Sequence, residues 1–452
     1  MSSESRKKAI GAPIRIVTRQ DKFKVGIQAV FRANALFTLG CHGLGVIGMS
    51  AVSPQRIPQL DALRGLAAAT VVPWHMLMFF PWMYATYQGV NGGHGWLMLP
   101  IPYVFIAGHP AVILFFVLSG FVLALPQMSG CQPIYRIYAW RRFCRIWIPY
   151  AACVSAAMLG ALWLGGFKDL PLSQWAWIMW TKPPSYGEIV QHAVLIDNFK
   201  SHAFNASIWS LVHEMRISLI FPLIAAMVMR RTVRRSLLLV VCCTLLAVTA
   251  SKLNARSSSL NSYATTLHYC GMFIVGAVLA KHHVALRQWV EMLSGWRRIG
   301  LLMVAVIFYT SDGWHRTMRF SATPFCDLLT TGGAAALIML ALGSKALTHW
   351  FPVWLGKISY SLYLWHQPVL LATVKLGWNI VPLPALLAIG GVLSVAVATA
   401  SQKWIEQPAI SFARQKWGLA ALPLQNERLA KAPRHQIASG HHQGDLADAG
   451  RA

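Results

Sequence analysis

The chain has 452 residues, of which 56% are hydrophobic and only 12% are charged, whereas soluble domains carry roughly 25% charged residues. This composition excludes an ordinary soluble domain and is typical of a protein with several membrane spans. The net charge of +26 suits a nucleic-acid partner, but the basic residues lie in short clusters between apolar runs and no nucleic-acid motif accompanies them. We therefore expect a lipid bilayer and no nucleic acid among the partners.

The sequence indicates no function for the N-terminal extension or for the cysteines. Residues 1–55 form a basic extension without a convincing signal-peptide cleavage site, so their role stays open. The eight cysteines show no Cys-x-x-Cys pair and no other metal-ligand spacing. We expect neither a bound metal nor a disulfide framework.

Apolar runs long enough to cross a bilayer follow one another along most of the chain. They predict an all-α, polytopic membrane bundle of about ten transmembrane helices. The runs fall at 66–88, 109–126, 147–167, 209–229, 236–251, 263–280, 299–311, 325–343, 353–376 and 383–405. We expect the transmembrane domain to cover residues 56–408, and the polar segment 409–452 to form a disordered cytoplasmic tail.

The distribution of basic residues predicts the orientation of the bundle. One set of loops holds clusters around Arg142, Arg231 and Arg298, while the opposite segments 89–108 and 168–208 hold few basic residues for their length. By the positive-inside rule the first set faces the cytoplasm. We expect an integral protein of the cytoplasmic (inner) membrane with both termini in the cytoplasm.

The longest non-cytoplasmic segment is rich in tryptophan, proline and polar residues. Trp175, Trp177 and Trp180 fall in it. Indole rings favour the membrane interface, because one end of the ring is apolar and the other can meet water. We expect these three side chains at that interface.

Arg64 and His75 stand eleven residues apart at the start of the first apolar run. Eleven steps of about 100° return to within about 20° of the starting direction, about 16 Å further along a helix, so both residues share one helix face. His75 then lies near the middle of a hydrocarbon core about 30 Å thick, where a titratable group is costly and indicates a functional site. Pro73, between the two, is expected to kink the helix.

Further motifs place polar residues inside the later apolar runs. They are FFVLSGF at 115–121, RRFCRIWIP at 141–149, WSLVHE at 209–214 and SYSLYLWHQP at 359–368. Together with the Arg64–His75 spacing, these motifs resemble the acyltransferase-3 family of integral membrane O-acyltransferases, which modify cell-surface glycans and related acceptors. The resemblance runs from about residue 56 to residue 408. In one departure, Met215 follows Glu214 where many members carry a second acidic residue.

The resemblance implies an enzyme that transfers acyl groups other than amino-acyl groups. It would move an acyl group, with acetyl favoured, from cytoplasmic acyl-CoA to a hydroxyl of a cell-surface glycan or a related lipid-linked envelope molecule. Acyl-CoA, favoured as acetyl-CoA, is then a co-substrate, and no cofactor is permanently bound. The alternative is a secondary transporter with His75, Arg64 and Glu214 as a proton relay, although no internal repeat supports it.

His75 and Glu214 are the candidate catalytic residues. An imidazole titrates near neutral pH, so His75 suits the role of a base that takes the acceptor's proton. It could instead attack the thioester and form an acyl-imidazole, or simply form a packing hydrogen bond between helices. Glu214 could orient an imidazole or accept hydrogen bonds from the acceptor, or could only favour a helix N-terminus.

Arginines on the cytoplasmic side are the candidate donor-binding residues. Arg142 and Arg145 carry guanidinium groups suited to the phosphates of acyl-CoA, and their alternative role is topology alone. Arg64 could bind a phosphate, position the acyl carbonyl or anchor the end of its helix.

Three residues are candidates for binding substrate. Ser119 could line the donor path, although packing of the Ser119-Gly120 pair between helices is the alternative. Tyr360 and His366 could line the acceptor or acyl pocket, whereas an aromatic belt at the membrane interface also explains such a span.

Overall fold

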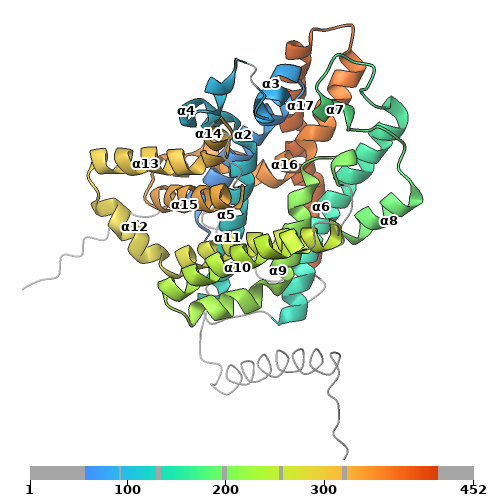
Figure 1. Cartoon of the computed structure of the whole chain (residues 1–452). Helices are drawn as coiled ribbons and strands as arrows, with labels where there is room; N and C mark the ends of the chain where they lie inside the picture. The colour runs from blue at the N-terminus through green and yellow to red at the C-terminus, as the bar shows by residue number, and fades with distance from the viewer. Residues whose placement is uncertain are drawn as a thin grey trace, which may run out of the picture. The chain divides into compact units, whose positions relative to one another are not determined.

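The computed structural model describes residues 56–90, 93–128, 134–195, 201–253, 258–317 and 323–415 (Figure 1). Helices make up its secondary structure, and the described ranges contain no strand, which confirms the all-α prediction. The N-terminal extension 1–55 and residues 416–452 of the expected tail lie outside the described residues. Within that expected tail, residues 409–415 are helical.

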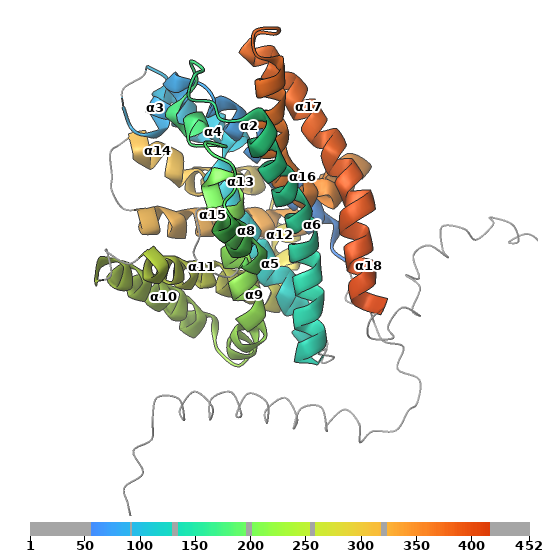
Figure 2. The same ribbon diagram turned by 90° about the vertical axis from the view of Figure 1, so that its right-hand side faces the viewer.

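The longer helices, in chain order, are α2 (Pro58–Leu77), α5 (Gly108–Met128), α6 (Tyr135–Leu164), α9 (Ile208–Met229), α10 (Val233–Leu253), α11 (Ser258–Lys281), α13 (Gly295–Tyr309), α15 (Thr323–Leu342), α16 (Trp350–Gly377) and α17 (Leu383–Ser401). The shorter ones are α3 (Pro81–Tyr87), α4 (Pro100–Tyr103), α7 (Gln174–Trp177), α8 (Tyr186–Val194), α12 (His283–Met292), α14 (Ser311–Thr317) and α18 (Gln407–Gln415). A π-helical turn, η5 (Gln402–Glu406), joins α17 to α18, and the three run on in one line in Figure 2.

The number of membrane spans is only partly settled. In the described ranges, seven helices are long and apolar enough to cross a membrane, or eight if α2 and α3 count as one bent span. The predicted spans 299–311 and 353–376 fall on α13 and α16, which are outside this set. α13 is 15 residues long, and α16 carries polar side chains through its middle. The polytopic bundle is therefore confirmed, and the count of about ten stays a prediction.

The first predicted span, 66–88, is broken into two helices. α2 ends at Leu77, and the chain bends by 115° into α3. Pro81 begins α3, and Phe80 before it is extended, with φ −82° and ψ 128°. A residue that precedes proline avoids the helical region for steric reasons, so the sequence stops α2 at this point.

Pro73, in contrast, lies inside α2 without ending it. Arg64 and His75 therefore stand on one uninterrupted helix, as their spacing predicts. A proline inside a helix removes one backbone hydrogen bond but leaves the following turns in register.

The predicted single domain divides into two compact units, each assembled from separate segments. The described parts of unit 1 lie within Met1–Thr70, Gly95–Ala139 and Ile217–Gly356, and those of unit 2 within Val71–His94, Trp140–Arg216 and Lys357–Ala452. Arg64 and Ser119 belong to unit 1. The other candidate residues belong to unit 2.

In unit 1, α5 and α11 pack backbone against backbone. A Cβ atom at Gly120 would collide with the backbone of Phe273, and one at Gly276 would collide with the carbonyl of Val117. Small residues allow such close approach between membrane helices. Of the two roles considered for the Ser119-Gly120 pair, Gly120 thus has that of close helix packing. Ser119 beside it is buried.

A buried polar network joins four helices of unit 1. His109 Nε2 lies 2.7 Å from Asp327 Oδ1, and His268 Nε2 lies 3.1 Å from Asp327 Oδ2. Thr244 Oγ1 lies 3.1 Å from His268 Nδ1. The four residues come from α5, α15, α11 and α10, so a single carboxylate fixes these helices in one register.

Replacing the central carboxylate should destabilise the protein strongly. Asp327→Ala leaves two buried imidazoles without their partner, and we expect the free energy of unfolding to fall by about 3 kcal/mol. Chemical denaturation in detergent micelles measures it. Glu291→Ala is the matched control, because Glu291 lies in an exposed ion pair with Arg287 at 2.9 Å and its removal should cost less than about 1 kcal/mol. Equal losses in the two variants would contradict this role of the network.

Candidate active site

Two histidines from distant parts of the sequence meet in unit 2. His75 Nδ1 on α2 lies 2.9 Å from His366 Nε2 on α16, and the two rings are 4.9 Å apart at a tilt of 34°. His366 is 0% exposed, while His75 keeps part of its surface accessible. His75 is therefore the member of the pair with accessible surface.

Hydrogen bonds assign the protons of this pair. His366 Nδ1 lies 2.9 Å from the carbonyl oxygen of Leu362, which can only accept, so Nδ1 of His366 carries the hydrogen. In the neutral ring, Nε2 of His366 then holds a lone pair and accepts from Nδ1 of His75. This leaves Nε2 of a neutral His75 with its lone pair available. That tautomer is the one that a general base needs.

The segment after α6 supplies a ring that stacks on His75. Trp175 of α7 lies over the imidazole with centroids 5.5 Å apart and planes at 25°. Ser173 fixes α7 at the break between α2 and α3, because its backbone N–H donates to Phe79 O at 3.0 Å and its hydroxyl donates to Met78 O. The same hydroxyl accepts from Ala176 N at the start of α7. The bend after α2 therefore positions the tryptophan above the histidine.

A proline on α16 frees a backbone acceptor next to the histidine pair. Pro368 has no N–H, so the carbonyl of Leu364 lacks its usual helical donor. Asn205 Nδ2 donates to this oxygen at 2.9 Å, and Cys153 Sγ lies 3.1 Å from it. Asn205 also accepts from Ser207 N at 3.0 Å, and this fixes the chain just before α9.

Buried hydroxyl groups continue from the histidine pair along α9 and α16. Ser207 Oγ lies 3.4 Å from His366 Nε2. The Tyr363 hydroxyl donates to Ser207 O at 3.0 Å and lies 2.7 Å from Ser210 Oγ. Ser210 and Glu214, four residues apart, share one face of α9, and Ser207 stands just before the start of this helix. We call Ser207, Ser210, Tyr363 and Glu214 the polar seam.

The RRFCRIWIP motif meets the far end of the polar seam. Arg142 Nη2 lies 3.9 Å from Glu214 Oε1, with both side chains largely buried. Tyr360 donates to Ile146 O at 2.8 Å and is close enough to Glu214 and Arg145 to experience their charges. The structure thus gathers two arginines, one carboxylate and one phenol beside α16.

A comparison with protein families covers the whole region that contains these residues. A family model described as an acyltransferase domain matches residues 57–402. The chain belongs to the acyltransferase-3 family. No curated protein and no solved structure gives a significant match. With this family and several apolar helices long enough to span a bilayer, the chain is an integral membrane protein with an acyltransferase domain.

Two candidate residues of this acyltransferase-3 site have neighbours that the sequence does not reveal. Glu214 Oε1 lies 3.9 Å from Arg142 Nη2, while His366 is the partner at Nδ1 of His75. His366 is fully buried and hydrogen-bonded on both ring nitrogens. Its place is behind the accessible histidine. The roles expected of both residues stay predictions. Tyr360 uses its hydroxyl to join α16 to α6.

Arg64 and Ser119 have neighbours within unit 1. Arg64 Nη1 lies 3.9 Å from Asp61 Oδ1, one turn away on α2. Ser119 stands on α5 beside the glycine that packs on α11. Their proposed contacts with the donor remain predictions.

Sequence reasoning missed several residues of the site. Asn205 and Ser207 lie in a loop without periodicity, and His202, close enough to act on the charge of His75, lies in the same loop. Trp175, expected at the membrane interface, stacks on the imidazole of His75, a contact that the sequence does not reveal. Trp180 was expected there too, but it is 1% exposed and donates to Phe204 O at 3.0 Å.

α8 lies beside the site and has its own titratable group. Ser185 and Glu188 form a capping box at its start, and the hydrogen bond from the Ser185 backbone is the main cause that lowers the pKa of Glu188 to about 2. Near its end, His192 Nδ1 lies 2.9 Å from the Tyr150 hydroxyl of α6. Burial lowers the pKa of His192 to about 4.

Acid should loosen α8. His192 in the detached helix takes up a proton near its ordinary pKa of 6.5, but in the docked helix only near 4, so docking is fully stable above pH 6.5 and weakens as the pH falls towards 4. Between pH 7.5 and pH 5 we expect a loss of about 2 kcal/mol. Hydrogen exchange of residues 186–194, corrected for the intrinsic rates, measures it. His192→Gln should abolish the loss and His349→Gln, at an exposed position, should not; the same loss in both variants refutes the assignment.

Proposed function

We propose that the protein is an O-acyltransferase that moves an acyl group, with acetyl favoured, from acyl-CoA to a hydroxyl of a cell-surface glycan or a related envelope molecule. The donor arrives from the cytoplasm and the acceptor from the opposite face of the cytoplasmic membrane. Both termini lie in the cytoplasm, in accordance with the positive-inside rule.

The observation that carries this proposal is the hydrogen bond between His75 and His366. It leaves a lone pair on Nε2 of His75, at the accessible side of the pair. As the acceptor oxygen attacks the thioester carbonyl, Nε2 takes the hydroxyl proton. The new C–O bond forms, the C–S bond breaks, and the same proton passes to the departing sulfur. The proton balance closes without an added acid or base.

His366 acts as a positioning residue in this scheme. It accepts from His75 Nδ1 and so stabilises the imidazolium that forms during attack. The role resembles that of the acidic member of a catalytic triad, with a neutral imidazole in place of a carboxylate. The hydrogen bond from His366 to Leu362 O keeps that imidazole in the accepting tautomer.

The donor is proposed to bind at the arginine end of the polar seam. Guanidinium groups pair well with phosphates, and Arg142 is held near Glu214 at 3.9 Å. Arg145 is the second proposed phosphate contact, and Arg64 is the third on the basis of its spacing from His75 alone. The thiol-bearing arm of acyl-CoA would then extend from these arginines towards His75.

Substitutions at the histidine pair test the chemistry. His75→Ala should lower the transfer rate at least 100-fold, because general base catalysis contributes about 10²–10⁴. His366→Leu removes a hydrogen bond to a charged imidazole, worth about 2 kcal/mol, so we expect about a 30-fold loss. His366→Gln, whose amide oxygen can accept, should retain more activity than His366→Leu and should displace the pH profile. Mass spectrometry of envelope glycans and lipids from cells that express each variant measures the acetyl mass increments.

The same variants decide against the transporter alternative. Acetyl transfer from labelled acetyl-CoA by protein in liposomes, without net solute uptake, supports the enzyme. Uptake of solute that depends on His75, with no acetylated product, would refute the proposed function. Thr399→Ala is a suitable control in the same unit, since its hydroxyl donates to the helix carbonyl of Val395 at 2.8 Å.

A further inference from the structure

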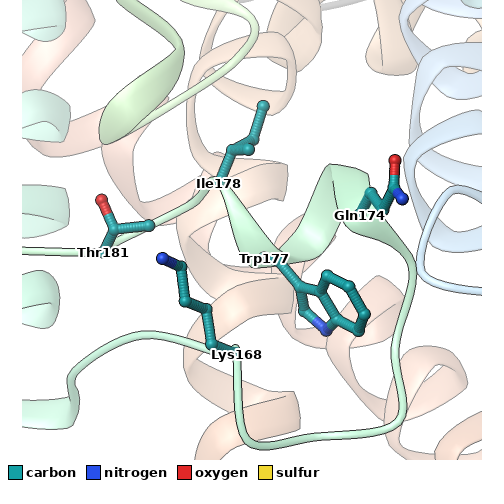
Figure 3. Close-up of a pocket in the computed structure, with 5 residues that line it drawn as sticks. All are labelled: Lys168, Gln174, Trp177, Ile178 and Thr181. Atoms are coloured by element: carbon teal, nitrogen blue, oxygen red, sulfur yellow. The ribbon is translucent and has the colours of Figure 1, made fainter.

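A pocket of about 470 Å³ opens in the segment that follows α6. Its lining consists of Lys168, Gln174, Trp177, Ile178 and Thr181 (Figure 3). The volume falls within the usual range for small-molecule sites, about 300–1,000 Å³. The lining combines an indole and a branched alkyl group with an amide, a hydroxyl and an ammonium group.

Contacts hold the backbone that carries this pocket. The Trp177 indole N–H donates to Leu170 O at 3.0 Å, which closes the loop between them. Lys375 of α16 donates to Gly166 O and lies over the Phe167 ring at 5.5 Å, just before Lys168. A site whose walls are already ordered loses less entropy on binding.

The polar side chains that line the pocket are available to bind a ligand. Among the described residues, the side chains of Lys168, Gln174 and Thr181 have no hydrogen-bond or ion-pair partner. Lys182, on the same segment, differs because its Nζ lies 3.0 Å from Glu188 Oε1. The lining therefore presents one positive charge and two neutral hydrogen-bonding groups to whatever enters.

α7 connects the pocket to the candidate base. Trp175 and Trp177 are two residues apart and so point to roughly opposite sides of this single turn. Trp175 stacks on His75 at 5.5 Å, while Trp177 lines the pocket. A molecule in the pocket is thus separated from the histidine by one helical turn, which Ser173 fixes in place.

We propose that this pocket is the acceptor subsite and that it takes an anionic carbohydrate, a sugar ring that bears a carboxylate or a phosphate. The indole and Ile178 face the apolar C–H surface of the ring. Gln174 and Thr181 bond to its hydroxyl groups. The Lys168 ammonium pairs with the anion. The role as acceptor subsite rests on the proposed function, whereas binding of the carbohydrate does not.

Binding of defined sugars to the full chain in lipid nanodiscs tests this proposal by titration calorimetry. The probes are cellobiose, cellobiouronic acid and cellobiose 6-phosphate. We expect the wild-type protein to bind at least one anionic probe at least tenfold more tightly than cellobiose. Lys168→Met, at an exposed position, should reduce that preference to less than twofold. Lys182→Met should keep it within twofold of wild type, because Glu188 already neutralises that charge.

The two anionic probes distinguish a carboxylate from a phosphate as the recognised group. Trp177→Leu should weaken all three probes about tenfold, because stacking on the ring is independent of charge. No preference in the wild-type protein, or a preference that survives Lys168→Met, overturns the proposal. If the preference and its loss are observed but no acyl group is ever transferred, the carbohydrate site stands and the proposed reaction fails.

Discussion

The hydrogen bond between His75 and His366 is the contact on which the site depends. It unites two helices whose residues are 291 positions apart in sequence, and it fixes the tautomer of the accessible ring. Trp175, Ser207 and the bend after α2 are arranged around it. In an apolar interior, a chain of hydrogen bonds with each donor and acceptor assigned is a rigid structure, since any other arrangement leaves a polar group unpaired.

Prolines inside helices recur as the source of hydrogen bonds between a helix carbonyl and a side chain from another part of the chain. Pro368 frees the carbonyl of Leu364 for Asn205, and Pro222 frees the carbonyl of Ser218, which accepts from the Tyr138 hydroxyl at 2.7 Å. In lipid, a carbonyl without a helical donor must find a side chain, and the segments that supply one are thereby brought together. The position of a proline in a helix thus determines which carbonyl needs a side-chain donor.

The sequence predicts the helical class and most helix positions, because hydrophobic runs are local signals. It does not predict which polar residues meet. The pairing of His366 with His75 and the approach of Glu214 to Arg142 depend on helix packing, which no local pattern encodes. The bend at Phe80 was readable from Pro81, whereas the hydrophobic run alone concealed it. Loop residues such as Asn205 carry no periodic pattern, and only the fold reveals them.

The anchoring of Ser173 to Met78 and Phe79 has a consequence for how the family could diversify. The segment that bears the pocket is anchored to the same bend that ends α2. If the pocket segment were exchanged between two members of the family, it would therefore keep its position in the new protein only if the bend after α2 were kept as well. Under the proposed function, the acceptor subsite and the alignment of the candidate base therefore depend on the same bend in the chain.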